Sequence, residues 1–417
     1  MKKDLKKQSI AKNPTVDVAI IGGGLAGGIA AAILARKGLE VVLFEKEKDP
    51  HHKVCGEFLS GESIPLLKQI GVDVAGLGAT TIGRFRLHGP KHTCEVTLPI
   101  KGAGISRKIL DEKVLEAAER AGAKVHRGEM VREVLEGLES PVGSIVVSTT
   151  EGEIRAQRLI VATGKAEFKT LQERVGRDSG YVGFKMHLKL KPSAEARIQN
   201  HCDLFVFEHG YGGLSMVEGG VANFCFLIEK TALKKIGSDW GSLASHIARH
   251  SWAASRYLDG AIPQFRHPVT IAHIPYGYLR RMSPPAGMFF VGDQMAVIPS
   301  LTGDGMSIAL MTGRMAAEHI MEKVSGKDRL AFAAESSRAY QRLVRRQLRS
   351  QIDTGYLVHR LFKQPMLIDY AAKALQRFPL IIESIFNATR CDLVLPEAKK
   401  AKRSRLGKGA ASNAHAP

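Results

Sequence analysis

The sequence contains little cysteine, and the cysteines form no recognisable framework. Only five of the 417 residues are cysteines, and they are far apart: Cys55, Cys94, Cys202, Cys225 and Cys391. The absence of a CxxC pair or a regular spacing argues against a disulfide scaffold and against a structural zinc site. The low number and wide spacing of the cysteines predict a reducing compartment such as the cytoplasm.

Long apolar runs are also lacking. The basic start MKKDLKKQ continues into polar residues, which argues against a cleavable signal peptide. The one long apolar segment, Val16 to Ala35, is interrupted by Asp17 and five glycines. Its order is typical of a strand, a turn and a helix rather than of a membrane span, so we expect a cytoplasmic protein.

Acidic residues are outnumbered, with 41 Asp and Glu against 60 Lys and Arg and a formal net charge of +19. Part of this excess lies in two basic tails, 1–14 and 396–417, which we expect to be disordered. Another part forms a positive stripe on one predicted helix, at Arg338, Arg342, Arg345, Arg346 and Arg349. Such a stripe can meet an anionic membrane surface, an acidic carrier protein or nucleic acid, and composition alone does not choose among them.

A glycine-rich turn lies between a strand and a helix near the start of the chain. Residues 16–21 (VDVAII) are apolar and β-rich, and residues 25–37 favour a helix. Gly22 and Gly24 between these segments and Gly27 in the second one match GxGxxG, which allows a tight turn and close approach of the backbone to a pyrophosphate. Glu45 ends the next predicted strand, 23 positions after Gly22, where a carboxylate can accept hydrogen bonds from a ribose.

A second constellation, near residue 290, favours FAD over NAD. The apolar run 288–291 (MFFV) leads to Gly292 and Asp293, and LTGDG then precedes a predicted helix. Asp293 is a candidate for binding a ribityl hydroxyl. The free N–H groups from Gly303 through Gly305 to Met306 can face the flavin N1 and O2, where reduced flavin gathers negative charge.

The rest of the chain predicts a second domain. At 44% hydrophobic residues, the sequence can bury a core large enough for two lobes. Residues 107–120 have helical apolar spacing, and from about 180 to 275 the pattern becomes that of an antiparallel sheet. The chain then returns to the first domain, and from 328 to 395 it is mostly helical.

These motifs, in this order, resemble the FAD-dependent oxidoreductases related to para-hydroxybenzoate hydroxylase, and within them the geranylgeranyl reductase-like branch. The resemblance covers roughly residues 15–390 and depends on five segments: VAIIGGGLAGGIAA, GISRKILDEKVLEAAERAGA, IVATG, GYGGLSMVEGGVANFCF and FVGDQMAVIPSLTGDGMSIAL. It implies an α/β fold in which a Rossmann-type FAD-binding domain is interleaved with an antiparallel β-sheet substrate domain. It also implies that Arg107 contacts the cofactor and that the strand around Val131 passes the adenine.

The division that follows assigns FAD-binding segments to 15–75, 105–175 and 280–327, and substrate-domain segments to 76–104 and 176–279. The C-terminal helices occupy 328–395, between the third FAD-binding segment and the basic tail at 396–417.

Two departures from the wider family narrow the chemistry. Ala162-Thr163-Gly164 stands where many aromatic hydroxylases have an Asp-Gly motif, which puts direct NADPH use in doubt. Flavin halogenases carry a WxWxIP signature, but Trp240 and Trp252 lie in no such setting, so halogenation is not expected.

The loop KVCGEF resembles the Cys-Gly loop that approaches the flavin ring in reductase-like members. The thiol of Cys55 is a candidate for protonating a substrate, and Glu57 is a candidate acid or base if burial raises its pKa. A buried structural cysteine and a solvated glutamate are the alternatives. His51 and His52 lie near Cys55, but no second ligand pair follows at metal spacing, so no metal is predicted.

The sequence thus predicts an FAD enzyme that acts on an apolar, isoprenoid- or polyketide-like substrate, free or bound to a carrier. It would act by hydride transfer from reduced flavin or by flavin-hydroperoxide oxygenation. The alternative is a nucleic-acid-associated flavoprotein such as a tRNA-modifying enzyme, motivated by the basic tails and the arginine stripe. The sequence favours it less, because no RNA-binding motif is recognisable.

Overall fold

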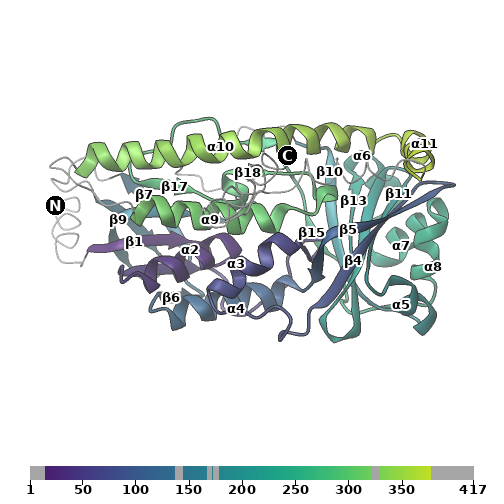
Figure 1. Ribbon diagram of the computed structural model, residues 1–417, viewed down its shortest axis with the longest axis horizontal. Coiled ribbons are helices and arrows are strands. Elements are labelled where there is room, and N and C mark those ends of the chain that lie inside the picture. Colours follow the sequence, from purple (N-terminus) through teal and green to yellow (C-terminus); the bar gives the residue numbers. More distant parts are fainter. Residues whose placement is uncertain (1–14, 137–143, 167–170, 172–177, 322–328, 377–417) are drawn as a thin grey trace, which may run out of the picture.

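The computed structural model describes residues 15–136, 144–166, 171, 178–321 and 329–376. The predicted basic tails, 1–14 and 396–417, lie outside the described residues. Two sheets lie at opposite ends of an elongated molecule, and helices run between them (Figure 1).

The first sheet has the strand order β6-β2-β1-β9-β8-β7, and β17 also pairs with β9. Its strands are β1 (Thr15–Ile21), β2 (Val41–Glu45), β6 (Lys124–Arg127), β7 (Val131–Glu136), β8 (Ile145–Thr149), β9 (Glu153–Val161) and β17 (Met288–Phe290). Pairing is parallel among β1, β2, β6, β9 and β17, whereas β7, β8 and β9 pair antiparallel. Alternate residues of β1 enter two cores, Val18 and Ile20 on one face and Ala19 and Ile21 on the other, so both faces of this sheet are covered.

Three helices cover one face of this sheet: α2 (Leu25–Arg36), α4 (Arg107–Arg120) and α9 (Gly305–Met321). Small residues let them pack closely. A Cβ atom on Gly28 would lie 2.7 Å from Cγ1 of Val114 in α4, and one on Gly313 would lie 2.2 Å from the carbonyl oxygen of Ala26 in α2. α2 and α9 are thereby held side by side.

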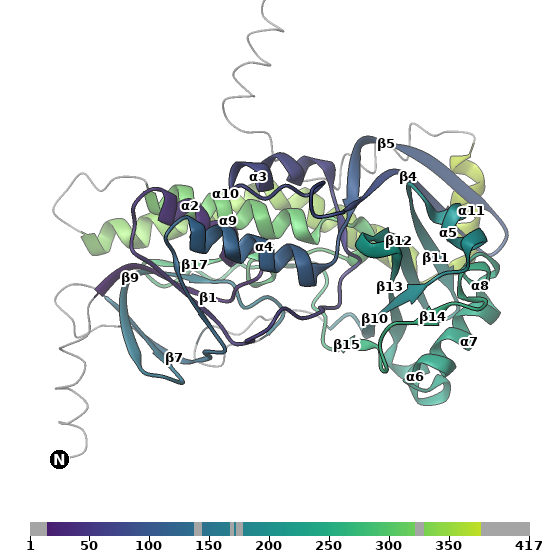
Figure 2. The same cartoon turned by 90° about the horizontal axis from the view of Figure 1, so that it is seen from below.

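The second sheet has the order β14-β10-β13-β12-β11-β4-β5-β3, with β15 paired to β10. Its strands are β3 (Phe58–Leu59), β4 (Thr80–His88), β5 (Thr93–Gly104), β10 (Tyr181–Lys189), β11 (His201–Phe207), β12 (Gly210–Val217), β13 (Val221–Glu229), β14 (Ile262–Pro263) and β15 (Val269–Ile271). Pairing is antiparallel except between β4 and β11. Four helices lie beside this sheet, as Figure 2 shows: α5 (Pro192–Ile198), α6 (Lys230–Ile236), α7 (Trp240–His250) and α8 (Trp252–Leu258).

The chain crosses between the two sheets four times, since β3 to β5 and β10 to β15 belong to the second sheet and the intervening strands to the first. The mixed α/β class and the Rossmann-type fold are therefore confirmed, while the residue bounds of the domains stay predictions. Between the sheets lie α3 (Ile64–Gln69) and a two-stranded sheet of β16 (Tyr278–Leu279) and β18 (Ala296–Val297).

A long helix, α10 (Arg329–Leu361), runs along one edge of the molecule and joins its two ends, and α11 (Pro365–Leu375) follows it over the second sheet (Figure 1). α10 packs against α9 and β17 at one end and against α11 at the other. Among the described residues, the helices are each too short or too polar to cross a bilayer.

Candidate functional site

The first glycine turn connects β1 to α2. Gly22 has a φ of +103°, and a Cβ atom there would lie 2.5 Å from the carbonyl oxygen of Ala162. A Cβ atom on Gly27 would lie 2.0 Å from the carbonyl oxygen of Gly22. These two glycines are needed for the turn to close, whereas Gly24 faces a cavity of about 170 Å³.

Two cations flank Gly24 at the N-terminus of α2. A Cβ atom on Gly24 would lie 3.7 Å from Nη2 of Arg107 and 3.9 Å from Nζ of Lys53. Both side chains also bind Asp111, with Arg107 Nε donating to Oδ1 at 2.6 Å and Lys53 Nζ to Oδ2 at 2.8 Å. Bare backbone, a helix N-terminus and two cations together suit a diphosphate.

Glu45 and Val131, the two residues predicted near the adenosine, lie in different surroundings. The Glu45 carboxylate accepts the backbone N–H of Gly23 at 2.7 Å, and it lines a small cavity of about 20 Å³ with Gly23 and Arg107. Val131 is buried with Val134 and Val147 and is not among the described residues that line this cavity or the larger one. Contacts of both residues with the cofactor stay predictions.

The second glycine turn also lines the larger cavity. Gly292, Asp293, Gly303, Gly305 and Met306 all line it, as does Gly24 of the first turn. Gly303 adopts a left-handed φ of +70°, and α9 begins at Gly305, where a Cβ atom would have no neighbour within 4 Å. The structure thus brings together two turns separated by about 280 residues, each at the start of a helix, around one cavity.

Asp293 forms an ion pair that the sequence did not reveal. Its Oδ2 lies 3.0 Å from Nζ of Lys165, which follows directly on Ala162-Thr163-Gly164 and also lines the cavity. The negative charge of Asp293 raises the pKa of Lys165. The charged side chain of Lys165 therefore lies in the cavity wall, next to the segment 162–164 that replaces the Asp-Gly motif.

Cys55 and Glu57 both line the same cavity, on the loop before β3. Cys55 is half-buried, and Asn223 of β13 donates to its carbonyl oxygen at 3.0 Å. Glu57 has a left-handed φ of 54°, and its backbone N–H lies 3.4 Å from the Cys55 sulfur. The loop is thus fastened to the second sheet and places Cys55 and Glu57 in the wall of the cavity.

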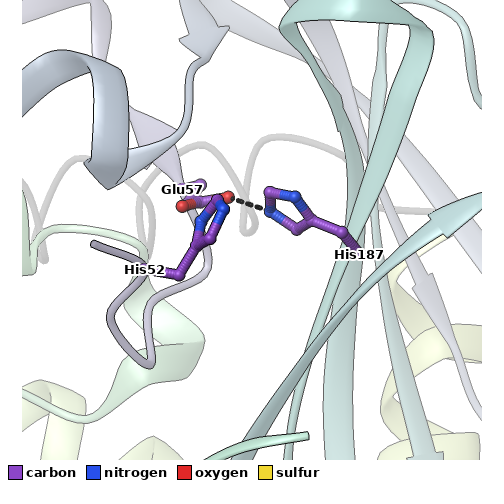
Figure 3. Close-up of side chains that lie close together, drawn as sticks. All are labelled: His52, Glu57 and His187. Carbon is purple, nitrogen blue, oxygen red and sulfur yellow. Dashed lines mark hydrogen bonds and ion pairs between the residues drawn. The ribbon is translucent and has the colours of Figure 1, made fainter. Parts of the chain in front are cut away.

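The Glu57 carboxylate is fully buried, and three groups form hydrogen bonds or ion pairs with it. Figure 3 shows His187, which extends from β10, pointing at Glu57, and their Nε2 and Oε2 atoms are 2.8 Å apart. The ammonium of Lys185, also on β10, forms an ion pair with Oε1, which accepts the Arg107 backbone N–H at 2.8 Å as well.

These partners overturn the premise on which an acid-base role for Glu57 was predicted. Burial by itself would raise the pKa of Glu57, but the hydrogen bond from His187 and the charge of Lys185 outweigh it and hold the pKa below its ordinary value. Glu57 therefore stays ionised, and we interpret it as a positioning residue of the cavity wall.

His52 completes a cluster with His187 and Glu57 in which the potential ligand atoms lie within 4.8 Å of one another. The sequence had grouped His52 with His51 and Cys55 instead. The Lys185 ammonium already neutralises the Glu57 carboxylate and lies 3.5 Å from Nδ1 of His52, where it would repel a metal cation. Burial and the charge of Lys185 lower the pKa of His52 to about 4, so its ring is neutral.

A second, apolar cavity of about 250 Å³ adjoins the first. Its wall combines strands of the second sheet with the ends of α10 and α11, including Phe85, Leu98, Leu204, Phe226, Phe362 and Ile368. The two cavities share lining residues at their junction: Gly56, Phe58, Cys225, Leu227, Ser300 and Gly303. The two cavities therefore meet at a common wall, close to the start of α9.

Sequence reasoning missed Lys165, Lys185 and His187. Lys185 and His187, followed by Lys189, alternate with apolar residues along the strand Tyr181–Lys189, which indicates that their side chains share one face. Lys165 carried no comparable signal, because it lies in a loop whose neighbours are distant in sequence.

The site fits FAD, an elongated group in which a diphosphate lies between the adenosine and the flavin ring, and the ring becomes anionic on reduction. The cationic turn at Gly24 suits the diphosphate, and the free N–H groups at the start of α9 suit the ring.

Comparisons with known proteins agree with this assignment. Residues 15–171 match the family described as the FAD binding domain. The chain is similar to a menaquinone reductase of Mycolicibacterium smegmatis, with 26% identity over 73% of this chain and 76% of that protein. It is also similar to a digeranylgeranylglycerophospholipid reductase of Methanosarcina mazei, with 24% identity over 83% of this chain and 84% of that protein.

Solved structures show the same fold. A flavin-dependent brominase superposes with a TM-score of 0.74 at 18% identity, covering 95% of this chain and 100% of that one. A geranylgeranyl bacteriochlorophyll reductase-like protein of Thermoplasma acidophilum superposes with a TM-score of 0.69 at 18% identity, covering 90% and 95%. The prediction of FAD as the cofactor is confirmed. The chain is therefore an FAD-dependent oxidoreductase with an FAD-binding domain over residues 15–171, and it is similar to the relatives of para-hydroxybenzoate hydroxylase and, among them, to the geranylgeranyl reductase-like branch.

Proposed function

We propose that this oxidoreductase reduces a carbon–carbon double bond of an isoprenoid-like lipid. The observation that carries the proposal is the shared wall between the apolar cavity and the cofactor cavity at Phe58 and Gly303. An unbranched or prenyl chain in the apolar cavity would end at the position predicted for the flavin ring. The relatives support a lipid substrate and a reduction, because they are named as reductases of menaquinone and of digeranylgeranylglycerophospholipid.

Bound FAD, once reduced, would supply a hydride, which adds to one alkene carbon while a proton must reach the other. The chain offers the Cys55 thiol for that proton, since it lines the cofactor cavity close to the junction. The N-terminus of α9 would stabilise negative charge, and the apolar wall would exclude water. Glu57, held by Lys185 and His187, would keep the Cys55 loop in place.

Oxygenation of the same substrate is the competing activity, and one experiment separates the two. The purified protein is reduced anaerobically and mixed either with oxygen or with geranylgeranylated lipids dispersed in detergent, while the flavin absorbance is followed. Fast reoxidation by the alkene, slow reaction with oxygen and a product heavier by two hydrogens are expected. Fast reoxidation by oxygen with a hydroxylated product would exclude the reductase.

In the same assay, Cys55→Ala is expected to slow reoxidation by the alkene about 100-fold or more, the usual size of a general-acid contribution. Its FAD content and its reaction with oxygen should be unchanged. If reoxidation by the alkene is equally fast in Cys55→Ala, the proton comes from another group.

A further inference from the structure

The end of α10 and the adjoining α11 expose an unusual number of large apolar side chains. Among the described residues, eleven large hydrophobic side chains are exposed, and five of them fall within these fourteen positions: Leu357, Leu361, Met366, Leu367 and Tyr370. We call these five residues the apolar tip. A contiguous exposed apolar patch on a globular protein commonly marks a surface that meets a partner or a membrane.

The exposed side of the same two helices is basic. The stripe predicted from the sequence lies here, with Arg338, Arg342, Arg346 and Arg349 exposed and Arg345 half-buried. Beyond it, Arg360, Lys363 and Lys373 are exposed in or near the segment of the apolar tip, and the exposed acidic residues among the described positions of these helices are Glu335 and Asp353. The positions 342, 346, 349, 353, 357 and 360 recur every three or four residues, so the arginines and Leu357 lie on one face of α10 together with Asp353, whose Oδ2 lies 3.8 Å from Nε of Arg349.

The opposite side of the tip lines the apolar cavity. Val358, Phe362 and Ile368 face inward as cavity wall, and Leu361 both lines the cavity and is 45% exposed. The cavity and the apolar tip therefore lie on two sides of the same helices, α10 and α11.

α11 is held firmly in that position. The buried carboxylate of Asp369 accepts the backbone N–H groups of Lys91 and His92, at 2.7 and 2.8 Å, from the turn between β4 and β5. Its second oxygen lies 2.9 Å from Nδ1 of His92. The outward side chains of α11 are thus presented on a fixed support.

We propose that the apolar tip and its arginine stripe dock this enzyme on an anionic lipid bilayer, so that a lipid substrate enters the apolar cavity from the membrane at α11. A bilayer is the occupant that fits a surface with an apolar centre and a basic margin, since the side chains of the tip would enter the acyl boundary while the arginines contact lipid phosphates. The substrate route depends on the proposed function, whereas the docking itself does not.

The test uses the full-length, FAD-loaded protein and flotation with two kinds of vesicle, equimolar phosphatidylglycerol and phosphatidylcholine, or phosphatidylcholine alone. Flotation with the anionic vesicles that weakens with salt is expected. The triple variant L357S/M366S/Y370S should reduce the partition coefficient by about tenfold or more, because it removes three large apolar side chains from the contact. The matched control I262S/M282S/M130S removes three equally exposed apolar side chains from other surfaces and should float like the wild type.

A second pair of variants tests the basic stripe. R342Q/R346Q/R349Q should weaken flotation and flatten its salt dependence, whereas K124Q/K234Q/K235Q, with the same change in net charge, should not. FAD content and thermal stability of every variant establish that it is folded.

Four outcomes would overturn the proposal. Failure of the wild type to float with anionic vesicles would do so, as would equal flotation of the tip variant and its control. A surface that instead binds tRNA in an arginine-dependent way, or that forms a dimer dissolved by the tip variant, would assign it to nucleic acid or to a second copy of this chain.

The docking proposal and the proposed reduction can be disproved independently of each other. Reoxidation by a detergent-dispersed prenyl acceptor needs no membrane, so the tip variant should keep it while losing reoxidation by the same lipid held in vesicles. If the wild type floats but neither form of the lipid reoxidises the flavin, the docking stands and the proposed reduction is wrong.

Discussion

Glu57 and Lys185 form an ion pair in which neither side chain is exposed to solvent. The two residues are 128 positions apart, and their pairing fastens the Cys55 loop to β10 of the second sheet. Two buried charges are stable only together, because either one alone would lack both water and a counterion. The pair therefore couples the geometry of the cofactor cavity to the integrity of the second sheet.

Lys185→Met should lower the free energy of unfolding by about 3–5 kcal/mol, because it leaves the Glu57 carboxylate buried without its cation. Urea denaturation measures this. E57Q/K185M should recover part of the loss, since no charge then stays unpaired. As a control, Lys124→Met breaks an ion pair with Glu40 in which both side chains are largely exposed, and it should change stability by less than about 1 kcal/mol. Equal effects of the two single variants would contradict the interpretation of the buried pair.

Two glycines of the first turn should respond differently to alanine. Gly24→Ala places a methyl group in the space between Arg107 and Lys53, so FAD should bind on the order of tenfold or more weakly while the apoprotein stays folded. Gly22→Ala forces a Cβ atom onto the Ala162 carbonyl at a φ of +103°, and should destabilise the apoprotein itself by about 2 kcal/mol or more.

Fluorescence titration of FAD and thermal denaturation of the two apoproteins distinguish these effects. If the Gly24→Ala protein binds FAD as tightly as the wild type, the diphosphate does not bind at this turn.

Local features of the fold could be predicted from the sequence. The helix expected at 107–120 is α4 with the same bounds, and the glycine turn lies between β1 and α2 as expected, because apolar spacing and turn chemistry are properties of neighbouring residues. The joining of the turns at Gly24 and Gly303 around one cavity agrees with the family resemblance, although the individual cofactor contacts stay predictions.

The surroundings of Glu57 could not be predicted in the same way. Its pKa depends on Lys185 and His187, which reach it only because β10 pairs with β13 and lies beside the Cys55 loop. Burial alone suggested a raised pKa, and the long-range partners reverse that direction. Pairings between distant strands leave little trace in a single sequence beyond the alternation of polar residues on one strand.

Filling the apolar cavity should block long substrates while leaving FAD in place. Gly213 of β12 lines the cavity, and a Cβ atom there would meet one backbone oxygen at 3.7 Å and otherwise open space. Gly213→Leu should therefore raise the KM for a geranylgeranylated acceptor by about tenfold or more, with FAD content unchanged, because a prenyl unit would lose its place in the wall. Steady-state kinetics with acceptors of increasing chain length measure the effect.

The matched control is Gly152→Leu, an exposed glycine between β8 and β9 that has no neighbour within 4 Å of its Cβ position. If long and short acceptors respond alike to Gly213→Leu, the substrate does not use this cavity.

His359 should make the protein sensitive to mild acid. Its ring on α10 is 2% exposed, lies among Tyr181, Tyr211 and Tyr276, and has Nδ1 at 3.1 Å from the hydroxyl of Tyr211. Burial, reinforced by the charge of Lys363, lowers the pKa of His359 from 6.5 to about 4. Between these two values the unfolded chain binds a proton that the folded protein does not, so stability falls as the pH falls through this window.

From pH 7 to pH 5 the loss attributable to His359 should be about 2 kcal/mol, and His359→Gln should remove it. Urea denaturation at the two pH values measures the difference, and the half-buried His52, whose pKa is also lowered to about 4, should leave a smaller residual slope in the variant. His267→Gln, which replaces an exposed ring, should keep the slope of the wild type. A slope that survives His359→Gln in full would mean that the ring accepts its proton inside the folded protein. The tyrosine cluster beneath the apolar tip would then tolerate a charge, which its burial and its aromatic lining argue against.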